Sequence, residues 1–473
     1  SFLTSCNTSA LPDGASVANI ASNPMSKVTY RNPWAWIPTL YFAQGIPFIF
    51  INMVTMVLFT QLGMSKADAT LYTGWLYLPW VIKPFWGPIV DVLKTKRWWT
   101  VMMQLCVAIG LGAIAFTLPL PKADAIAEGL PVTSFMLCLF FYFITAFCSA
   151  THDIASDGFY MLALDTNQQS MFVGIRSTFY RCASVFGQGG LVMIAGALQN
   201  ATGDVAWGWK CTVIGLSVFF FLVFLWHAFI LPYPAADKPV GGEGKKSVGD
   251  IVRGFIDSFG TFFKKPYVVL AILFMLLYRL PEAQVVKLCQ VFLLAPVDEG
   301  GLGMSQMEAG FAYGVLAIVG LTIGGIIGGI VAANGGLRKW IWPMALATSL
   351  NCVAYIILSQ LQPDYATMAG KIITWCCIIL EQFAYGFGFT AFMLFMMYFA
   401  EGPYKTSHYA ICTAFMALGM MLPGMAAGWI MEDLLGNSYQ NFFFWVLGCN
   451  LATWLVTALV RPHIDPKYGA KNN

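Results

Sequence analysis

Charged side chains are scarce in this sequence. Only 10% of its 473 residues are Asp, Glu, Lys or Arg, whereas 58% are hydrophobic. Soluble globular proteins carry about 25% charged residues. With a mean hydropathy of +0.68, the chain has too few polar side chains to cover a water-soluble core. The composition therefore excludes a soluble globular fold and predicts an all-α membrane protein.

Signals for metals and nucleic acids are also missing. The four His residues are scattered, no CxxC pair occurs, and all twelve Cys except Cys6 lie in apolar stretches that are typical of helix packing. The net charge of +3 gives no basic footprint for nucleic acid. We expect no metal, no cofactor, no nucleic-acid partner and no enzymatic activity. The expected partners are a small-molecule substrate, protons and the lipid bilayer, and the expected state is a monomer.

Apolar runs of the length that crosses a bilayer, about 20 residues, recur along the chain. Twelve such runs are found, near 35–62, 66–90, 99–119, 134–160, 174–198, 211–231, 267–294, 309–332, 341–360, 368–400, 409–431 and 442–460. The chain begins with Ser1 rather than Met, and the Ser-, Asn- and Ala-rich residues 1–30 are expected to be loose and to contain no cleavable signal.

The distribution of Lys and Arg predicts how these spans are oriented. If the N-terminus is cytoplasmic, seventeen Lys and Arg fall in cytoplasmic segments and four in outer loops. Cytoplasmic loops carry the excess of basic residues in membrane proteins. We therefore predict a multi-pass protein of the bacterial inner membrane with both termini in the cytoplasm.

The longest polar stretch divides the spans six and six. It contains GGEGKK at residues 241–246, a composition typical of a flexible linker. The predicted organisation is an N-terminal cytoplasmic segment, a six-helix half, a cytoplasmic linker, a second six-helix half and a cytoplasmic tail, at residues 1–34, 35–231, 232–266, 267–460 and 461–473. Two such halves are the architecture of major facilitator transporters.

A short motif recurs after the second and eighth spans. Gly87 and Asp91 delimit GPIVD, which is followed by basic residues that include Arg97. GIVAA at 329–333 is followed by Arg338 and Lys339. The first copy resembles the major facilitator signature G-x-x-x-D and the second its degenerate repeat. We expect a close helix contact at the Gly and an acid near a neighbouring helix N-terminus, forming a cytoplasmic gate.

Ionisable residues within spans are costly and therefore point to function. Asp153 and Asp157 in the fourth span are four residues apart and share one helix face. Both cannot remain ionised in lipid without a cationic partner, which makes the pair a candidate proton-coupling site. Arg176 and Arg181 are the natural partners, and His152 is a further candidate. A purely structural ion-pair network is the alternative.

Polar residues in other spans are candidates for substrate binding. In the seventh span, Arg279, Glu282 and Lys287 lie around Pro281, which frees backbone carbonyls. In the tenth span, Glu381 and Gln382 interrupt a long apolar run. Glu381 either binds substrate or proton, or pairs with a cation of the seventh span.

The first and second spans contribute one more polar candidate each. Gln44 is followed by Gly45 and Pro47, which weaken the helix there. Lys83 precedes Pro84, and its ammonium group either faces the cavity or snorkels to the membrane surface.

Several of these segments together resemble one family, the AmpG-type muropeptide permeases of the major facilitator superfamily. YFAQGIP at 41–47 is similar to the family's YFSQGLP, and LP at 78–79 with KPFWGP at 83–88 and Asp91 is similar to LPxxLKFLWAP followed by an acid. THDIASDG at 151–158 is similar to SQDIxxDA, GIR at 174–176 to GYR, and EQ at 381–382 with GFGFTAF at 386–392 to ENxxxGxGTAAF. The chain departs from the family where His152 replaces a Gln and where the charged pair expected beyond Asp157 is absent.

The resemblance implies proton-driven import of peptidoglycan fragments, N-acetylglucosamine–anhydro-N-acetylmuramic acid with or without peptide, from periplasm to cytoplasm. The residues alone indicate a proton-coupled transporter but no particular sugar. Another amino sugar, a sugar acid or a related anionic solute is the alternative substrate, with acetyl-coenzyme A a weaker option. A non-transporting receptor on the same fold is the alternative class, which the lack of a soluble signalling domain disfavours.

Overall fold

The structure is a computed structural model in which residues 31–119, 132–164, 166–238, 248–402 and 405–468 are described. Within these ranges every regular element is a helix and no strand occurs. The first half contains η2 (Pro33–Ala35), α1 (Ile37–Ile49), η3 (Phe50–Val54), α2 (Thr55–Gln61), α3 (Lys66–Trp75), α4 (Leu78–Leu93), α5 (Lys96–Thr117), α7 (Val132–Ala163), α8 (Thr166–Val185), η4 (Phe186–Leu191), α9 (Val192–Thr202) and α10 (Val205–Ile230).

The second half follows α11 (Val248–Phe263). It contains α12 (Val268–Leu277), α13 (Leu280–Leu294), η5 (Val297–Glu299), α14 (Gln306–Phe311), η6 (Ala312–Leu316), α15 (Ala317–Gly335), α16 (Leu337–Thr348), α17 (Leu350–Leu361), α18 (Met368–Ala400), α19 (Lys405–Trp429), η7 (Ile430–Leu434), α20 (Tyr439–Val460) and η8 (Arg461–His463).

Eleven helical segments of the described chain are long and apolar enough to cross a membrane. They coincide with eleven of the twelve predicted spans. The remaining predicted span, 66–90, is helical but divided, because α3 ends at Trp75 and α4 begins at Leu78. The apolar run is continuous across this break, so hydropathy alone could not reveal it. The all-α fold with about twelve spans is confirmed.

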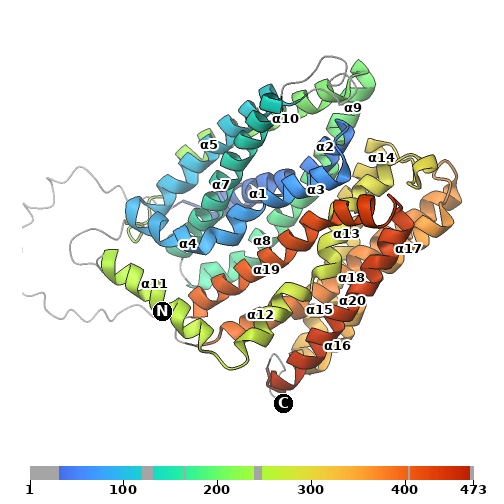
Figure 1. The fold of residues 1–473 in the computed structure, drawn as a ribbon. Coiled ribbons are helices and arrows are strands. Elements are labelled where there is room, and N and C mark those ends of the chain that lie inside the picture. The colour runs from blue at the N-terminus through green and yellow to red at the C-terminus, as the bar shows by residue number, and fades with distance from the viewer. Residues whose placement is uncertain (1–30, 120–131, 165, 239–247, 403–404, 469–473) are drawn as a thin grey trace, which may run out of the picture.

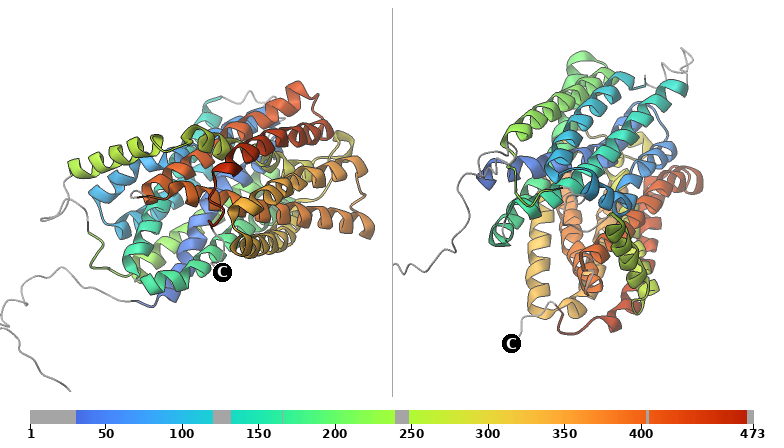
Figure 2. Two further views of the ribbon diagram at one scale, coloured as in Figure 1. Left: turned by 90° about the horizontal axis from the view of Figure 1, so that it is seen from below. Right: turned by 90° about the vertical axis from the view of Figure 1, so that its left-hand side faces the viewer.

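The two halves lie side by side as separate helix bundles. Figure 1 shows the first half above, in blue to green, and the second half below, in yellow to red, and the views of Figure 2 agree. Small residues allow close packing within the second half. A Cβ atom on Gly324 would clash with the backbone of Phe383, and one on Gly386 would clash with that of Leu321. Close approach of α15 and α18 therefore depends on glycine, as is common between membrane helices.

Four of the spans contain a π-helical turn, in η3, η4, η6 and η7. Two of these turns meet across the halves, where a Cβ atom on Gly189 in η4 would lie 2.5 Å from the Cα atom of Gly314 in η6. π-Turns free backbone carbonyls and are frequent at functional sites. Here the freed carbonyl of Asn52 in η3 accepts a hydrogen bond from Lys287 of the second half at 3.1 Å.

Polar contacts close one end of the bundle, which we call the α3 end because α3 begins there. The Glu432 carboxylate accepts hydrogen bonds from the backbone N–H groups of Lys66 and Ala67, at 2.7 and 2.8 Å. Gln306 donates to Gln61 at 2.6 Å and to Gln199 of the first half at 2.8 Å. The opposite end, where α5 begins, is called the α5 end. The two halves are thus held together by hydrogen bonds at the α3 end.

The predicted linker contains a helix that the sequence analysis missed. The GGEGKK segment lies outside the described residues, but α11 follows it and lies at the α5 end (Figure 1). Its Phe262 is fully buried, with its ring 5.5 Å from that of Phe399, while Phe259 contacts Phe85 of the first half at 5.4 Å. Apolar residues of α11 recur at helical spacing, but its 16 residues are too few for a span and include three charges, Asp250, Arg253 and Asp257.

Candidate functional site

The acidic pair of α7 forms the first part of the candidate site. Asp157 is held by two groups, because Arg176 of α8 donates to its Oδ1 at 3.0 Å and the Tyr41 hydroxyl of α1 donates at 3.2 Å. The Arg176 guanidinium also lies over the rings of Tyr41 and Tyr160, at 4.5 and 5.0 Å from their centroids. Three helices therefore fix the position of Asp157, and its contact with Arg176 is the one the sequence predicted.

Asp153 has a different cationic partner. The Lys83 ammonium of α4 lies 3.5 Å from its Oδ2, so Lys83 points toward α7 rather than to the membrane surface. The Gln44 side chain of α1 lies beside the Asp153 carboxyl. At normal hydrogen-bond distance no described group donates to the buried Oδ1 of Asp153 or Oε1 of Gln44, although the Gln44 amide is close enough to the Asp153 carboxyl to interact with it. Because buried polar atoms normally have partners, these two oxygens mark a place for a water molecule or a ligand.

The second half supplies an ion pair of its own. Arg279 Nε donates to Glu282 Oε2 at 2.8 Å, and a second guanidinium nitrogen contacts the other carboxylate oxygen. Arg279 also lies 3.4 Å from the Tyr385 hydroxyl. The pair sits where α12 ends and α13 begins with Pro281 at an early position. The carbonyls freed at this break, of Leu277 and Tyr278, accept from the Thr453 hydroxyl at 3.1 and 3.2 Å.

Glu381 is buried in α18 without a cationic partner. Its two oxygens accept hydrogen bonds from the Gln382 amide, at 3.0 and 2.8 Å. Arg279 pairs with Glu282, and Lys287 donates to the Asn52 carbonyl and the Thr73 hydroxyl, so no ion pair of Glu381 occurs in the described part of the chain. The proposed pairing of Glu381 with a seventh-span cation is therefore absent from this structure.

Three tyrosines connect the polar groups of the two halves. Tyr77, in the turn between α3 and α4, is within electrostatic range of both Asp153 and Arg279. Tyr180 of α8 is within range of Asp153 and of Tyr385 on α18. The α7 acids and the Arg279–Glu282 pair therefore face one centre, lined by tyrosine, between the halves. Sequence reasoning missed these tyrosines, although hydroxyls within apolar runs offered a signal.

His152 lies on another side of α7. Its ring hydrogen-bonds the amide of Gln104 in α5 at 2.9 Å, and Gln104 in turn contacts His227 of α10 at 3.0 Å. The His227 ring also bonds the Thr39 hydroxyl at 2.9 Å. The structure thus places His152 in a buried network that joins α5, α7 and α10, and does not bring it to the two carboxylates.

The expected gate residues are not brought together. A Cβ atom on Gly87 would meet no described atom within 4 Å, so the close helix contact predicted at this glycine is not found among the described residues. Arg97 caps the end of α10, donating to the carbonyls of Ala228 at 2.5 Å and Leu231 at 3.2 Å. The side chain of Asp91 lies outside the described part of the structure.

Arg338, in the degenerate copy of the motif, begins α16 at the α5 end. Its carbonyl accepts from Arg461 at 3.2 Å. A contact of the Arg338 side chain with the first copy of the motif is not found among the described residues. The motif residues lie at the α5 end, whereas the hydrogen bonds that join the halves lie at the α3 end.

Solvent exposure of the site rises toward the α5 end. The Asp153 side chain is 14% exposed and that of Asp157, one turn nearer the end of α7, is 38% exposed. Arg279, on the other side of the centre, is 9% exposed at its side chain. The candidate site is therefore more buried at its centre and more exposed toward the α5 end, while hydrogen bonds join the halves at the α3 end.

The family follows from comparison with known proteins. The model of the Major Facilitator Superfamily matches residues 38–407. The chain belongs to the major facilitator superfamily. Within it, the chain is similar to AmpG-type permeases, as the motifs predicted: it is 21% identical to the anhydromuropeptide permease of Escherichia coli, over 90% of this chain and 79% of that protein. It is 24% identical to the AmpG 4 transporter of Rickettsia conorii, over 78% of this chain and 83% of that protein.

Solved structures agree on the fold. The nucleoside transporter NupG superposes with a TM-score of 0.63 at 15% identity, covering 91% of this chain and 98% of that one. The D-xylose–proton symporter gives a TM-score of 0.63 at 14% identity, covering 93% and 99%. The chain is thus a transmembrane transport protein of the major facilitator fold.

Proposed function

We propose that this protein is a proton-coupled secondary transporter that imports peptidoglycan-derived amino-sugar fragments, anhydro-muropeptides or related saccharides, from the periplasm into the cytoplasm. The observation that carries the proposal is the pair of buried oxygens on Asp153 and Gln44 that accept no hydrogen bond at normal distance from the described groups. They lie at the centre between the halves, where transporters of this architecture bind their substrates. Similarity to AmpG-type permeases supplies the substrate class.

The arrangement of charges supports proton coupling. Each α7 acid has one cation, Lys83 for Asp153 and Arg176 for Asp157. Protonation of a carboxyl neutralises it and weakens its ion pair, which releases the cation to other acceptors. An acidic group on the ligand is one such acceptor. Proton binding and ligand binding then favour the same state, which is the requirement for symport.

The second half supplies groups that suit an amino sugar. Glu381 is a buried acceptor for ligand hydroxyls, and Gln44 can both donate to and accept from an acetamido group. The Arg279–Glu282 pair and Tyr385 present further donors at the same centre. We propose Gln44, Lys83, Arg279, Glu282, Glu381 and Gln382 as the substrate-binding set, and Asp153, Asp157 and Arg176 as the coupling set.

Topology follows from the Lys and Arg count, with both termini in the cytoplasm of a bacterium and the α3 end facing the periplasm. In this orientation the structure has its closed end outside and its solvent-exposed end inside. It therefore corresponds to a state that faces the cytoplasm. Gly87, Asp91, Arg97 and Arg338 act only when the protein turns outward and the α5 end closes.

Ligand binding by the purified protein tests the substrate class. The disaccharide N-acetylglucosamine–anhydro-N-acetylmuramic acid should bind in calorimetry, and Gln44→Ala should weaken binding by roughly 5- to 100-fold, because a buried ligand group is left unpaired. Maltose, which has no acetamido group, should not compete. Competition by maltose at equal concentration would contradict the amino-sugar class.

A second substrate class is favoured by the cations at the centre. Lys83 is 31% and Arg176 29% exposed at their side chains, so both are open to an anionic ligand. A sugar acid without acetamido groups is therefore the alternative. Tighter binding of glucuronate than of the disaccharide would favour it.

A further inference from the structure

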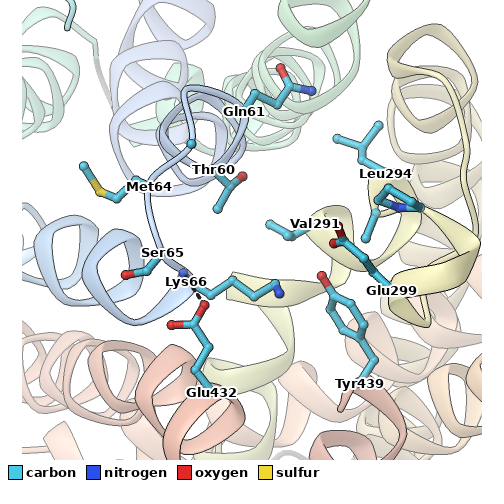
Figure 3. Close-up of a pocket in the computed structure, with 13 residues that line it drawn as sticks. Thr60, Gln61, Met64, Ser65, Lys66, Val291, Leu294, Glu299, Glu432 and Tyr439 are labelled. Atoms are coloured by element: carbon cyan, nitrogen blue, oxygen red, sulfur yellow. Dashed lines mark hydrogen bonds between the residues drawn. The ribbon is translucent and has the colours of Figure 1, made fainter. Parts of the chain in front are cut away.

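A second polar cavity lies at the α3 end, away from the central site. Its volume is about 460 Å³, and it opens between the turn that joins α2 to α3 in the first half and the ends of α13 and η7 in the second. Figure 3 shows its lining, in which Lys66, Glu299, Glu432 and Tyr439 supply polar groups, and Val291 and Leu294 supply apolar ones. The size falls within the range of about 300–1,000 Å³ that is usual for small-molecule sites.

One buried polar atom of this cavity has no partner. Tyr439 is 2% exposed, and its hydroxyl makes no hydrogen bond to any described group. Its ring is packed against Phe292, with centroids 5.2 Å apart. Figure 3 shows the hydroxyl directed into the space that Glu299, Val291 and Lys66 border. Buried tyrosine hydroxyls normally find a partner, so this one points to a bound molecule.

The remaining polar groups offer both donors and acceptors. The Lys66 ammonium donates to Asn437 at 2.9 Å and lies 5.0 Å from the Tyr439 ring centroid, which leaves further N–H groups free. The Glu299 carboxylate has no ion pair or hydrogen bond among the described side chains, although it lies within electrostatic range of Lys66. The Glu432 carboxylate, in contrast, is fully engaged by the start of α3.

We propose that this outer pocket is a second binding site for the transported amino sugar, used before the ligand reaches the centre. Hydroxyl and acetamido groups of a saccharide meet Tyr439 and Glu299, and an apolar ring face meets Val291 and Leu294. The inference rests on the proposed function, because it takes the ligand class from there. Since both halves line the pocket, separation of the halves at the α3 end opens its path to the central site.

Two conservative variants test the outer pocket. Tyr439→Phe removes only the hydroxyl and keeps the ring packing. Glu299→Gln changes an exposed carboxylate that makes no hydrogen bond or ion pair with the described residues. Initial rates of uptake of labelled N-acetylglucosamine–anhydro-N-acetylmuramic acid are measured in proteoliposomes. Each variant should raise KM by about 3- to 10-fold with an unchanged maximal rate, because one ligand hydrogen bond is lost in the encounter step only.

Glu308→Gln is the matched control. Glu308 lies at the same end but does not line the pocket, and Gln can replace it in the capping contact with Ser305. The substitution also removes a solvent-exposed ion pair with Lys371 at 4.0 Å, which contributes little. Its KM should equal that of the wild type. If Tyr439→Phe lowers the melting temperature, Glu299→Gln still decides the result.

The outcomes separate the two proposals. If the wild type takes up the amino sugar and both pocket variants have the same KM as the wild type, the outer site is refuted and the proposed function is not affected. No uptake of the amino sugar by the wild type overturns the proposed function and this inference with it. A raised KM in both pocket variants and not in Glu308→Gln supports the outer site.

Discussion

Replacement of Glu381 by Gln separates ligand binding from structural support. The substitution keeps the shape of the side chain and removes its charge. Glu381 is 5% exposed and accepts only from the neighbouring Gln382 among the described groups. Because no Lys or Arg of the described chain pairs with Glu381, removal of its charge breaks none of the observed ion pairs, in contrast to the loss of one partner of a buried pair.

The expected magnitudes follow from this environment. If a ligand hydroxyl donates to Glu381, exchange of the carboxylate for an amide should cost about 1–3 kcal/mol of binding energy. This corresponds to a dissociation constant raised by roughly 5- to 150-fold. Stability should not fall, since burial of a neutral amide costs less than burial of an unpaired carboxylate.

Calorimetry and thermal unfolding of the same preparation give both quantities. The dissociation constant of the amino-sugar disaccharide should rise while the melting temperature is unchanged or higher. Glu401→Gln makes the same chemical change at an exposed position beyond the end of α18 and should alter neither value. A markedly lower melting temperature with normal binding would show that Glu381 supports the helix packing and does not bind ligand.

Three further predictions concern coupling, orientation and the closed end. Asp153→Asn and Asp157→Asn should abolish proton-driven accumulation but leave exchange of ligand across the membrane, because an amide cannot take up and release a proton. Full accumulation in both single variants and in the double variant would refute the coupling role. In a cysteine-free background, an impermeant maleimide added outside intact cells should label Glu299→Cys and not Asp257→Cys in α11; the reverse pattern refutes the topology. Glu432→Ala removes two charge-assisted hydrogen bonds between the halves, so the rate at which the maleimide labels Val291→Cys in the outer pocket should increase several-fold. An unchanged labelling rate would show that Glu432 does not hold the α3 end closed.

Hydropathy predicted most of the fold, because each span must cover a bilayer with apolar side chains. It could not reveal the break at residues 76–77, where the apolar run continues while the helix turns. It also missed α11, which is too short to span a bilayer and carries three charged residues, although Phe262 is buried. Local pattern therefore predicts which residues are in spans, but not where a span bends or which polar helix docks beside it.

The candidate site was predictable only in part, for a related reason. The spacing of Asp153 and Asp157 shows that they share a face, and of the two cations expected as partners, Arg176 and Arg181, the first pairs with Asp157. The partnership of Asp153 with Lys83 joins residues 70 positions apart, and no periodicity encodes it. The close contact expected at Gly87 is not found among the described residues, and a sequence does not specify which conformation of a transporter is observed.

Uptake of the labelled amino-sugar disaccharide into proteoliposomes, with and without a proton gradient, tests the central claim most directly. When the solution on the side of the membrane that the α3 end faces is made acidic, the wild-type protein should accumulate the disaccharide on the other side above its concentration in that solution. A protonophore should abolish this accumulation. Equal uptake with and without the gradient would contradict proton coupling. Absence of uptake under both conditions would contradict the amino-sugar substrate itself.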